Sequence, residues 1–247
     1  YIGYMGGDRK KSLGLHEDEV KLLQEVGPVN DKSTVVLIGG NMIMMTEWYG
    51  CVNAVMMAYY PGMEGGTAIA EIIYGDVNPS GKLPYVVPYS EDELPHVDWE
   101  ATDQYYEYYH GYTRLEKNGV KPLIPYGYGL SYTTFEITDP KAETDGTNLK
   151  VRAKVKNTGD RDGDEVVQVY VGFEHSAVDR PVKQLRGFQR VSLKAGEEKV
   201  VEIVTPLEKL KWYNPVYREW QLEHMEYPIY VGSSSAEEDL KKTNITL

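Results

Sequence analysis

Carboxylate side chains are the first candidates for chemistry in this sequence, because two of them about 5 Å apart can act as nucleophile and general acid in a hydrolysis. Asp8 stands beside Arg9, which favours an ion pair or a loop brace. Glu47 is expected to begin or cap a helix. Glu64 is expected at the start of the next helix, where a carboxylate complements the positive helix end. None of the three is therefore a candidate catalytic residue.

Other common catalytic motifs are absent from the sequence. Residues 75–83 are not a phosphate-binding loop, since Gly75 and Gly81 have five residues between them rather than four and Leu83 replaces the magnesium-binding Ser or Thr. Residues 129–133 lack the second glycine of a serine-hydrolase elbow. The five histidines have no zinc-site spacing; they are His16, His96, His110, His175 and His224. No metal and no cofactor are expected.

Residues 59–84 make the most specific demands on the backbone. Glycines at 62, 65 and 66 precede a run of small and apolar residues with helical spacing over 67–74, and Gly75 supplies a helix stop. We expect Gly65 and Gly66 to let the chain turn sharply into the helix, with a left-handed conformation at Gly66. Residues 76–81 are rich in turn formers. The pattern predicts a strand, a loop and a helix followed by a turn.

Strands alternate with helices in the first half of the chain. Residues 17–26 form an amphipathic helix with acidic residues at its start, and 34–39 form an apolar run typical of a buried parallel strand. Residues 52–59 predict a second strand. This alternation indicates a parallel sheet with covered faces, and two or three strands make such a sheet narrow and incomplete.

Tyrosines are concentrated between residues 105 and 112. One interpretation is that their rings fill a seam between two domains, with hydroxyls reaching water at the rim. The alternative is that a few of the rings stack on the C–H face of a sugar. The first is preferred, because the cluster is long and uneven rather than a short projecting loop.

After residue 135 the hydrophobic period changes to two. Residues 149–156 alternate apolar with basic side chains, as a half-buried antiparallel strand does. Further short strands are expected at residues 166–171, 191–193, 199–204 and 227–231, several of them separated by turn residues. The spacing predicts an all-β sandwich.

The tract 59–84, together with PYGYGLSYTTF at 125–135, resembles glycoside hydrolase family 3, the family of β-glucosidases and related exo-acting glycosidases. Residues 157–170 and 180–188 resemble the fibronectin type III-like domain that many members carry. The resemblance implies an α/β sandwich with a partial, mostly parallel sheet, followed by an all-β fibronectin type III-like sandwich. We expect residues 1–125 to be the C-terminal part of the family's α/β sandwich domain and 126–247 to be the second domain.

The resemblance also implies which parts of such an enzyme lie elsewhere. The family's N-terminal (β/α)8 barrel, which carries an aspartate nucleophile, has no counterpart in these 247 residues. The acid/base glutamate of the family would stand two positions before Tyr1. We therefore expect no catalytic residue in this chain, Tyr1 as a substrate-binding neighbour of the acid/base, and no activity of this fragment alone. Whether the barrel is on the same polypeptide or a separate chain stays open.

The implied function is part of a retaining exo-acting β-glycosidase, most simply a β-glucosidase that hydrolyses terminal non-reducing β-D-glucosyl residues of oligosaccharides or aryl β-glucosides. The alternative is a non-catalytic carbohydrate-binding or assembly module. The sequence leaves the sugar and its linkage open.

Composition and charge limit the classes of binding partner that we expect. The net charge of −12, from 38 acidic and 26 basic residues, argues against nucleic acid and against an anionic membrane surface. No apolar run is long enough to span a membrane. Cys51 is the single cysteine, so the fold does not depend on an internal disulfide. A homodimer stays open, and so does the compartment, whether cytoplasmic, periplasmic or secreted.

Overall fold

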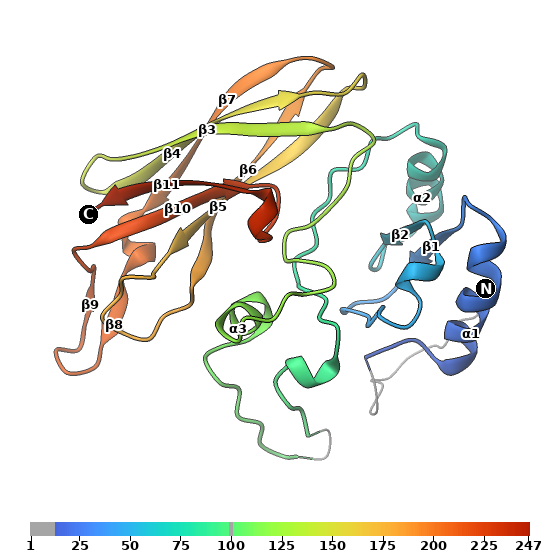
Figure 1. Cartoon of the computed structure of the whole chain (residues 1–247), viewed down its shortest axis with the longest axis horizontal. Helices are drawn as coiled ribbons and strands as arrows, with labels where there is room; N and C mark the ends of the chain where they lie inside the picture. The colour runs from blue at the N-terminus through green and yellow to red at the C-terminus, as the bar shows by residue number, and fades with distance from the viewer. Residues whose placement is uncertain (1–12, 99–100) are drawn as a thin grey trace.

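The computed structural model describes residues 13–98 and 101–247, and it divides them into two parts that lie side by side (Figure 1). The first part contains helices and a small parallel sheet. The second part contains the long antiparallel strands of a β-sandwich. Two such parts were expected, because the hydrophobic period of the sequence changes near residue 135. In the part of the chain that the structure describes, no helix is long and apolar enough to cross a membrane.

The first part is built from helix α1 (Glu17–Val26), strand β1 (Thr34–Leu37), strand β2 (Ala54–Met57) and helix α2 (Gly65–Tyr74). Strands β1 and β2 pair in parallel, with Thr34 opposite Ala54. Short 3-10 turns at Gly27–Val29 and Tyr49–Cys51 connect these elements. The helices and strands predicted for this half are confirmed, with strand bounds a few residues shorter than expected.

The sheet of the first part is less buried than its sequence indicates. The apolar run at 34–39 is typical of a strand covered on both faces, yet only Leu37 of β1 is fully buried. The cause is the number of neighbours, since β1 and β2 form a sheet of two strands and each has one unpaired edge. The sequence of β1 is therefore suited to a wider sheet.

Helix α2 begins and ends at glycines, but not all of them have the expected conformations. Gly75 adopts the left-handed conformation with φ 82° and ends the helix as predicted. The prediction of a left-handed Gly66 is wrong: Gly62 carries the positive φ of 73°, and Gly66 lies inside the helix. Gly65 is constrained by packing, because a Cβ there would lie 2.6 Å from Cγ of Pro61.

The segment between the two parts is irregular and returns to the first core. Val87 and Ile124 form an antiparallel bridge, and both are buried beside Trp48 and Met45. A 3-10 turn (Glu91–Glu93) and helix α3 (Gly111–Lys117) lie between them. The chain then runs directly into the sandwich.

The sandwich consists of two antiparallel sheets. One has the strand order β3-β4-β7 and the other β11-β10-β5-β6, with a small hairpin β8-β9 beside them. Their bounds are β3 Phe135–Thr144, β4 Asn148–Asn157, β5 Gly163–Gly172, β6 Lys183–Leu193, β7 Glu198–Pro206, β8 Trp212–Asn214, β9 Glu219–Gln221, β10 Glu226–Gly232 and β11 Leu240–Thr246. Two further 3-10 turns lie at Leu207–Leu210 and Glu237–Asp239.

The core of the sandwich lies between the facing sheets. Strand β4 shows the predicted alternation, with Leu149, Val151, Ala153 and Val155 all buried. Strand β5 is more uniformly buried. The five predicted strand segments are confirmed, whereas β3, β8, β9 and β11 were not predicted.

Candidate functional site

Of the residues singled out by sequence, the structure describes Glu47 and Glu64. Tyr1, the expected substrate neighbour, and Asp8 lie outside the described residues. Glu64 precedes helix α2 as expected, and its Oε2 lies 3.5 Å from the hydroxyl of Thr67. Glu47 lies in a turn rather than in a helix, where its carbonyl accepts a hydrogen bond from Gln24. Within 13–98 and 101–247, no cluster of three His, Cys, Asp or Glu side chains could hold a metal ion.

The two sequence tracts instead meet at the contact between the two parts of the chain. We call this contact the domain seam: residues 76–82 and 126–134, with the sandwich residues that they touch. Asn78 is its centre, because its Oδ1 accepts hydrogen bonds from the Ser131 hydroxyl and the Tyr132 amide, both at 2.8 Å. Its Nδ2 donates to the carbonyl of Asp162 at 3.0 Å. One side chain thus ties the turn after α2 to both the second tract and the sandwich.

The end of helix α2 is fixed to the same place. The Tyr132 hydroxyl donates to the carbonyl of Ile72 at 2.7 Å, and the Arg161 guanidinium hydrogen-bonds the carbonyl of Gly75. The Ile72 carbonyl is one of the last four of the helix and also accepts the amide of Gly75, the residue that caps the helix. The seam therefore satisfies the helix end as well as joining the domains.

A buried glutamine holds the second tract. Nε2 of Gln168, on β5, donates to the carbonyls of Gly127 at 2.9 Å and Ser233 at 2.6 Å. Its Oε1 accepts a hydrogen bond from Tyr170 at 2.6 Å. Gly127 has φ 75°, and a Cβ there would lie 2.1 Å from Oε1 of Gln168. Only glycine fits both the backbone conformation and the space.

An ion pair crosses the seam beside this glutamine. Nζ of Lys82 lies 2.8 Å from Oε1 of Glu165 and donates to the carbonyl of Gly129 at 3.0 Å. Both charged side chains are almost completely buried. Gly129 approaches the first tract so closely that a Cβ would lie 2.0 Å from the carbonyl oxygen of Gly81. Gly129 therefore serves the close approach of two backbones.

Tyrosine rings fill the seam next to helix α3. Tyr112 stacks on Tyr126 with ring centroids 4.7 Å apart and meets Tyr170 edge-on at 6.1 Å. Its hydroxyl accepts a hydrogen bond from the amide of Leu185, and burial raises the pKa of Tyr112 to about 12. Tyr170 is fully buried and the other two rings are half-buried, so the three rings fill the contact between α3, the second tract and the sandwich.

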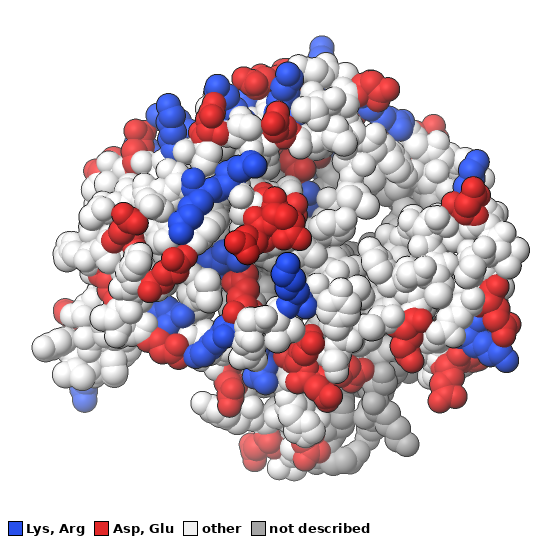
Figure 2. All heavy atoms as spheres, viewed as in Figure 1, with Lys and Arg blue, Asp and Glu red and all other residues white. Residues whose placement is uncertain are grey.

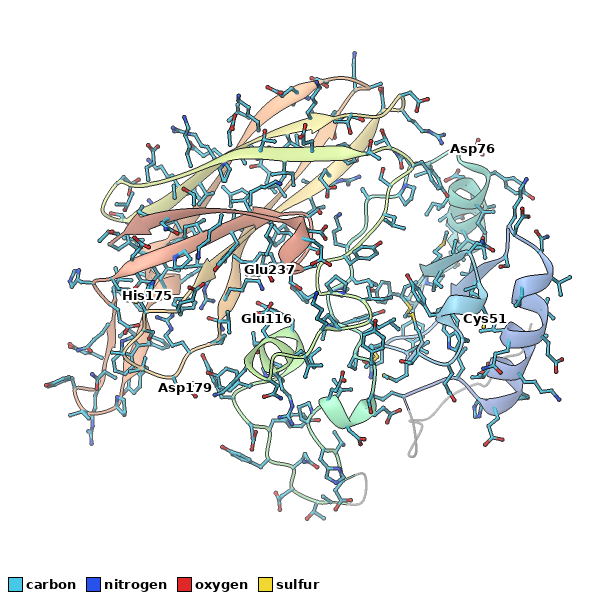
Figure 3. All side chains as sticks on the ribbon, viewed as in Figure 1. Cys51, Asp76, Glu116, His175, Asp179 and Glu237 are labelled. Carbon is cyan, nitrogen blue, oxygen red and sulfur yellow. The ribbon has the colours of Figure 1, made fainter. Side chains whose placement is uncertain are left out.

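Helix α3 is held on strand β6 by a second buried pair. The Lys183 ammonium hydrogen-bonds Oε1 of Glu116, while Oε2 of Glu116 is buried without a hydrogen-bond partner. Burial raises the pKa of Glu116, and the adjacent Lys183 lowers it by less. Figure 3 shows Glu116 at the point where α3 faces the sandwich.

The interpretation of the tyrosine tract as seam filling is correct for Tyr112 and wrong for three of its neighbours. Tyr105, Tyr106 and Tyr108 are exposed. Tyr109 is also on the surface side, where its hydroxyl donates to Asp179 at 2.7 Å and Lys117 lies over its ring. The tract is divided because Tyr112, at the start of α3, packs against β6 through Leu185, whereas the exposed rings precede the helix.

Tyr128 and Tyr132 also differ from a fully buried seam. The Tyr128 ring is half-buried and packs on the core of the first part, around Val87 and Ile124. Tyr132 is partly exposed, although its hydroxyl is bound. The tract is thus held from both sides, with Tyr128 and Gly129 against the first part and Gly127 against Gln168 of the sandwich.

Profiles of known families match both parts of the chain. The profile described as "Glycosyl hydrolase family 3 C-terminal domain" matches residues 4–132, more than half of the chain. The chain belongs to glycoside hydrolase family 3. The profile described as "Fibronectin type III-like domain" matches residues 165–235 in the sandwich. The fold class expected from the two tracts is confirmed.

Relatives match this family 3 chain along nearly its whole length. Thermostable beta-glucosidase B of Acetivibrio thermocellus is 35% identical over 96% of this chain and 32% of that protein. Xylan 1,4-beta-xylosidase of Xylanibacter ruminicola is 34% identical over 99% of this chain and 27% of that protein. The solved structure of a β-glucosidase from Streptomyces venezuelae in complex with D-glucose superposes with a TM-score of 0.87 at 34% identity, covering 96% of this chain and 31% of that one. The chain thus spans about a third of the length of these relatives.

Sequence reasoning found the two tracts but missed the residues that join them. Asn78 is one polar residue in a turn-forming run, and Gln168 is one polar residue in a strand. Neither carries a local signal of its role, because its partners across the seam are 41 to 84 residues away in sequence. The one local signal is the pair of glycines at 127 and 129, which do mark a close approach.

Proposed function

We propose that this chain is the C-terminal part of a retaining exo-acting β-glycosidase, with D-glucosides as the first substrates to test. The catalytic aspartate and the acid/base glutamate would lie outside it, on a (β/α)8 barrel and next to Tyr1. The support is family membership together with relatives whose names are β-glucosidase and xylosidase. Because those names differ in sugar, the sugar of this enzyme is the least supported part of the proposal.

The observation that carries the proposal is that the first part has unpaired strand edges and exposed apolar side chains. Strands β1 and β2 have apolar sequences suited to a wider sheet, yet each lacks a neighbour on one edge. Tyr60 and Tyr74 are 78% and 83% exposed, and Met63 is fully exposed. The visible face over α2 and this sheet is largely free of charged side chains (Figure 2). Apolar surface of this extent is typical of an interface.

The seam supports a definite role for the chain in such an enzyme. Two glycine contacts, a buried ion pair and Asn78 hold the two parts together, so the sandwich would brace the α/β part against its remaining neighbours. We infer a domain boundary at residues 125 and 126, because Tyr126 is the first residue of the second tract bonded to the sandwich, through Ser235 at 2.9 Å. Residues 1–125 and 126–247 are the proposed domains.

The alternative function is that of a non-catalytic carbohydrate-binding or assembly module. Two measurements distinguish it from the proposed glycosidase. The mass of the native protein in solution shows whether a barrel is present on the same polypeptide or on a bound chain. Proton NMR of the sugar released by that protein from an aryl β-glucoside then reports the stereochemistry. Release of the β-anomer first supports a retaining β-glucosidase. A barrel-free native protein that releases no sugar supports the module.

A further inference from the structure

An open groove of about 670 Å³ lies on the sandwich, away from the residues of the domain seam. One wall is the hairpin β8-β9, which projects from the end of the sandwich in Figure 1. The opposite wall is the loop before β6, whose Asp179 is labelled near helix α3 in Figure 3. The side chains that matter for recognition are Tyr108, Arg186, Lys209, Trp212, Tyr213 and Trp220. The proposed glycosidase chemistry uses none of them.

Aromatic rings dominate the hairpin side of the groove. Tyr213 and Trp220 face each other as cross-strand partners, with ring centroids 5.6 Å apart and planes at 64°. Trp220 is 63% exposed, although a tryptophan on a short hairpin gains stability by burial. Tyr108 exposes a further ring at the opposite wall. Flat rings held in this way fit the C–H faces of sugar rings, with their N–H and O–H groups left for hydroxyls.

Positive charge is concentrated beside these rings, in a chain whose net charge is −12. Four basic residues line the groove, against Asp179 and Glu208; they are Arg180, Arg186, Lys209 and Lys211. Asp179 is already bound by Lys117 at 3.0 Å. Arg180 is bound by Glu223 at 3.3 Å. The remaining groups leave an excess of positive charge for a ligand.

Arg186 is a partly buried basic residue without a counter-ion. Among the residues that the structure describes, no carboxylate lies within ion-pair distance of it, and its guanidinium donates to the side chain of Gln184. Its Nε is buried and has no hydrogen-bond partner. Burial and the nearby Arg180 lower the pKa of Arg186, as expected for an uncompensated charge. A guanidinium in this state suits a planar carboxylate, which it can bind through two parallel hydrogen bonds.

We propose that this groove binds an oligosaccharide that carries a hexuronic acid, with Trp220 and Tyr213 stacking on sugar rings and Arg186 binding the uronate carboxylate. The proposal does not depend on the glycosidase activity proposed above, and it stands whether or not that activity is confirmed. A carbohydrate is favoured over an acidic peptide. An acidic peptide side chain would use only the positive charge of the groove, whereas a sugar acid would use both that charge and the exposed aromatic rings.

The test is titration calorimetry of the full-length protein with two ligands: a xylotetraose that carries one glucuronic acid, and unsubstituted xylotetraose. We expect tighter binding of the acidic ligand. Trp220→Ala should weaken binding of both by about tenfold, the size of one lost stacking contact. Tyr217→Ala is the matched control, because Tyr217 lies on the same hairpin and is 70% exposed but does not line the groove. Turnover of an aryl β-glucoside should be unchanged in both variants.

Arg186→Gln should remove the preference for the acidic ligand while leaving neutral binding within about twofold. If that variant does not fold, Lys209→Gln tests the same charge from an exposed position and should reduce the preference about twofold to threefold. Acrylamide quenching, compared between wild type and Trp220→Ala, should show an accessible Trp220 in the unliganded full-length protein. Three results would each overturn the proposal: no preference for the acidic ligand, equal losses in the Trp220 and Tyr217 variants, or a Trp220 protected by another segment of the polypeptide. Equal binding of a glutamate-rich peptide would overturn the choice of ligand.

Discussion

The hydroxyl of Ser131 donates a 2.8 Å hydrogen bond to Oδ1 of Asn78, and this contact between residues 53 positions apart joins the two sequence tracts. Each tract has a recognisable local pattern, yet each is completed only by the other. The Asn78 side chain also binds the amide of Tyr132 and the carbonyl of Asp162, so it connects the first part, the crossing tract and the sandwich. The seam is therefore one network rather than separate contacts.

Replacing Asn78 by Ala should weaken this network. Three hydrogen bonds are lost, one of them half-buried and two exposed, so we expect a loss of about 2–3 kcal/mol in the free energy of unfolding. Chemical denaturation measures it. Asn244→Ala, at an exposed position of β11, is the control and should change the free energy by less than about 0.5 kcal/mol. Equal effects of the two substitutions would show that Asn78 does not hold the seam.

The two glycines at the start of helix α2 should respond in opposite ways to alanine. Gly66→Ala places a Cβ in open space within a helix, so stability should be unchanged or rise by up to about 1 kcal/mol. Gly65→Ala forces a Cβ against the ring of Pro61 and should lower the melting temperature. Thermal melts of the two variants decide this point. If Gly66→Ala were destabilising, that result would support the left-handed conformation of Gly66 that was expected from sequence.

Removal of the Tyr128 ring tests whether this tract is structural. Its ring packs against the first core and is half-buried, so Tyr128→Ala in the full-length protein should cost about 2–4 kcal/mol of stability. The KM of the folded fraction for an aryl glucoside should hardly change. Normal melting with a KM raised tenfold or more would instead make Tyr128 a sugar-contacting residue.

Stability should depend on pH through Glu116. Its pKa is raised above the ordinary value of 4.5 in the folded state, so the folded chain binds this proton more tightly than the unfolded chain does. The resulting stabilisation is complete below pH 4.5 and is lost as the pH rises through the raised pKa. Glu116→Gln mimics the protonated form, and its melting temperature relative to wild type should rise between pH 4 and pH 7. A difference that is constant over this range, or that falls, would contradict the raised pKa.

Local chemistry made much of the fold predictable from sequence. Gly75 ends α2 because only glycine enters the left-handed conformation freely, and the alternation from Leu149 to Val155 determines which face of β4 is buried. Strand β11 carried no comparable signal, since its apolar residues are few and its position depends on pairing with β10. The hairpin β8-β9 was missed because its strands have three residues each.

The candidate site was less predictable for the same physical reason. The burial of a tyrosine depends on what lies opposite it, so Tyr112 and Tyr108 differ although they belong to one tract. The buried pair of Glu116 and Lys183 joins residues 67 positions apart, and neither residue has a local pattern that identifies the other. Strand β1 differs from these examples, because its local pattern is clear. Its apolar sequence is typical of a strand covered on both faces, yet the strand is only partly buried in the two-stranded sheet.

The turnover of an aryl β-glucoside by the purified 247-residue chain, alone and co-expressed with a family 3 (β/α)8 barrel segment, tests the central claim most directly. The account predicts no turnover by the chain alone, because correct positioning of nucleophile and acid supplies much of such catalysis and the chain is proposed to hold neither. It predicts turnover when the two segments form a complex. Measurable hydrolysis by the chain alone, free of contaminating enzyme, would contradict it.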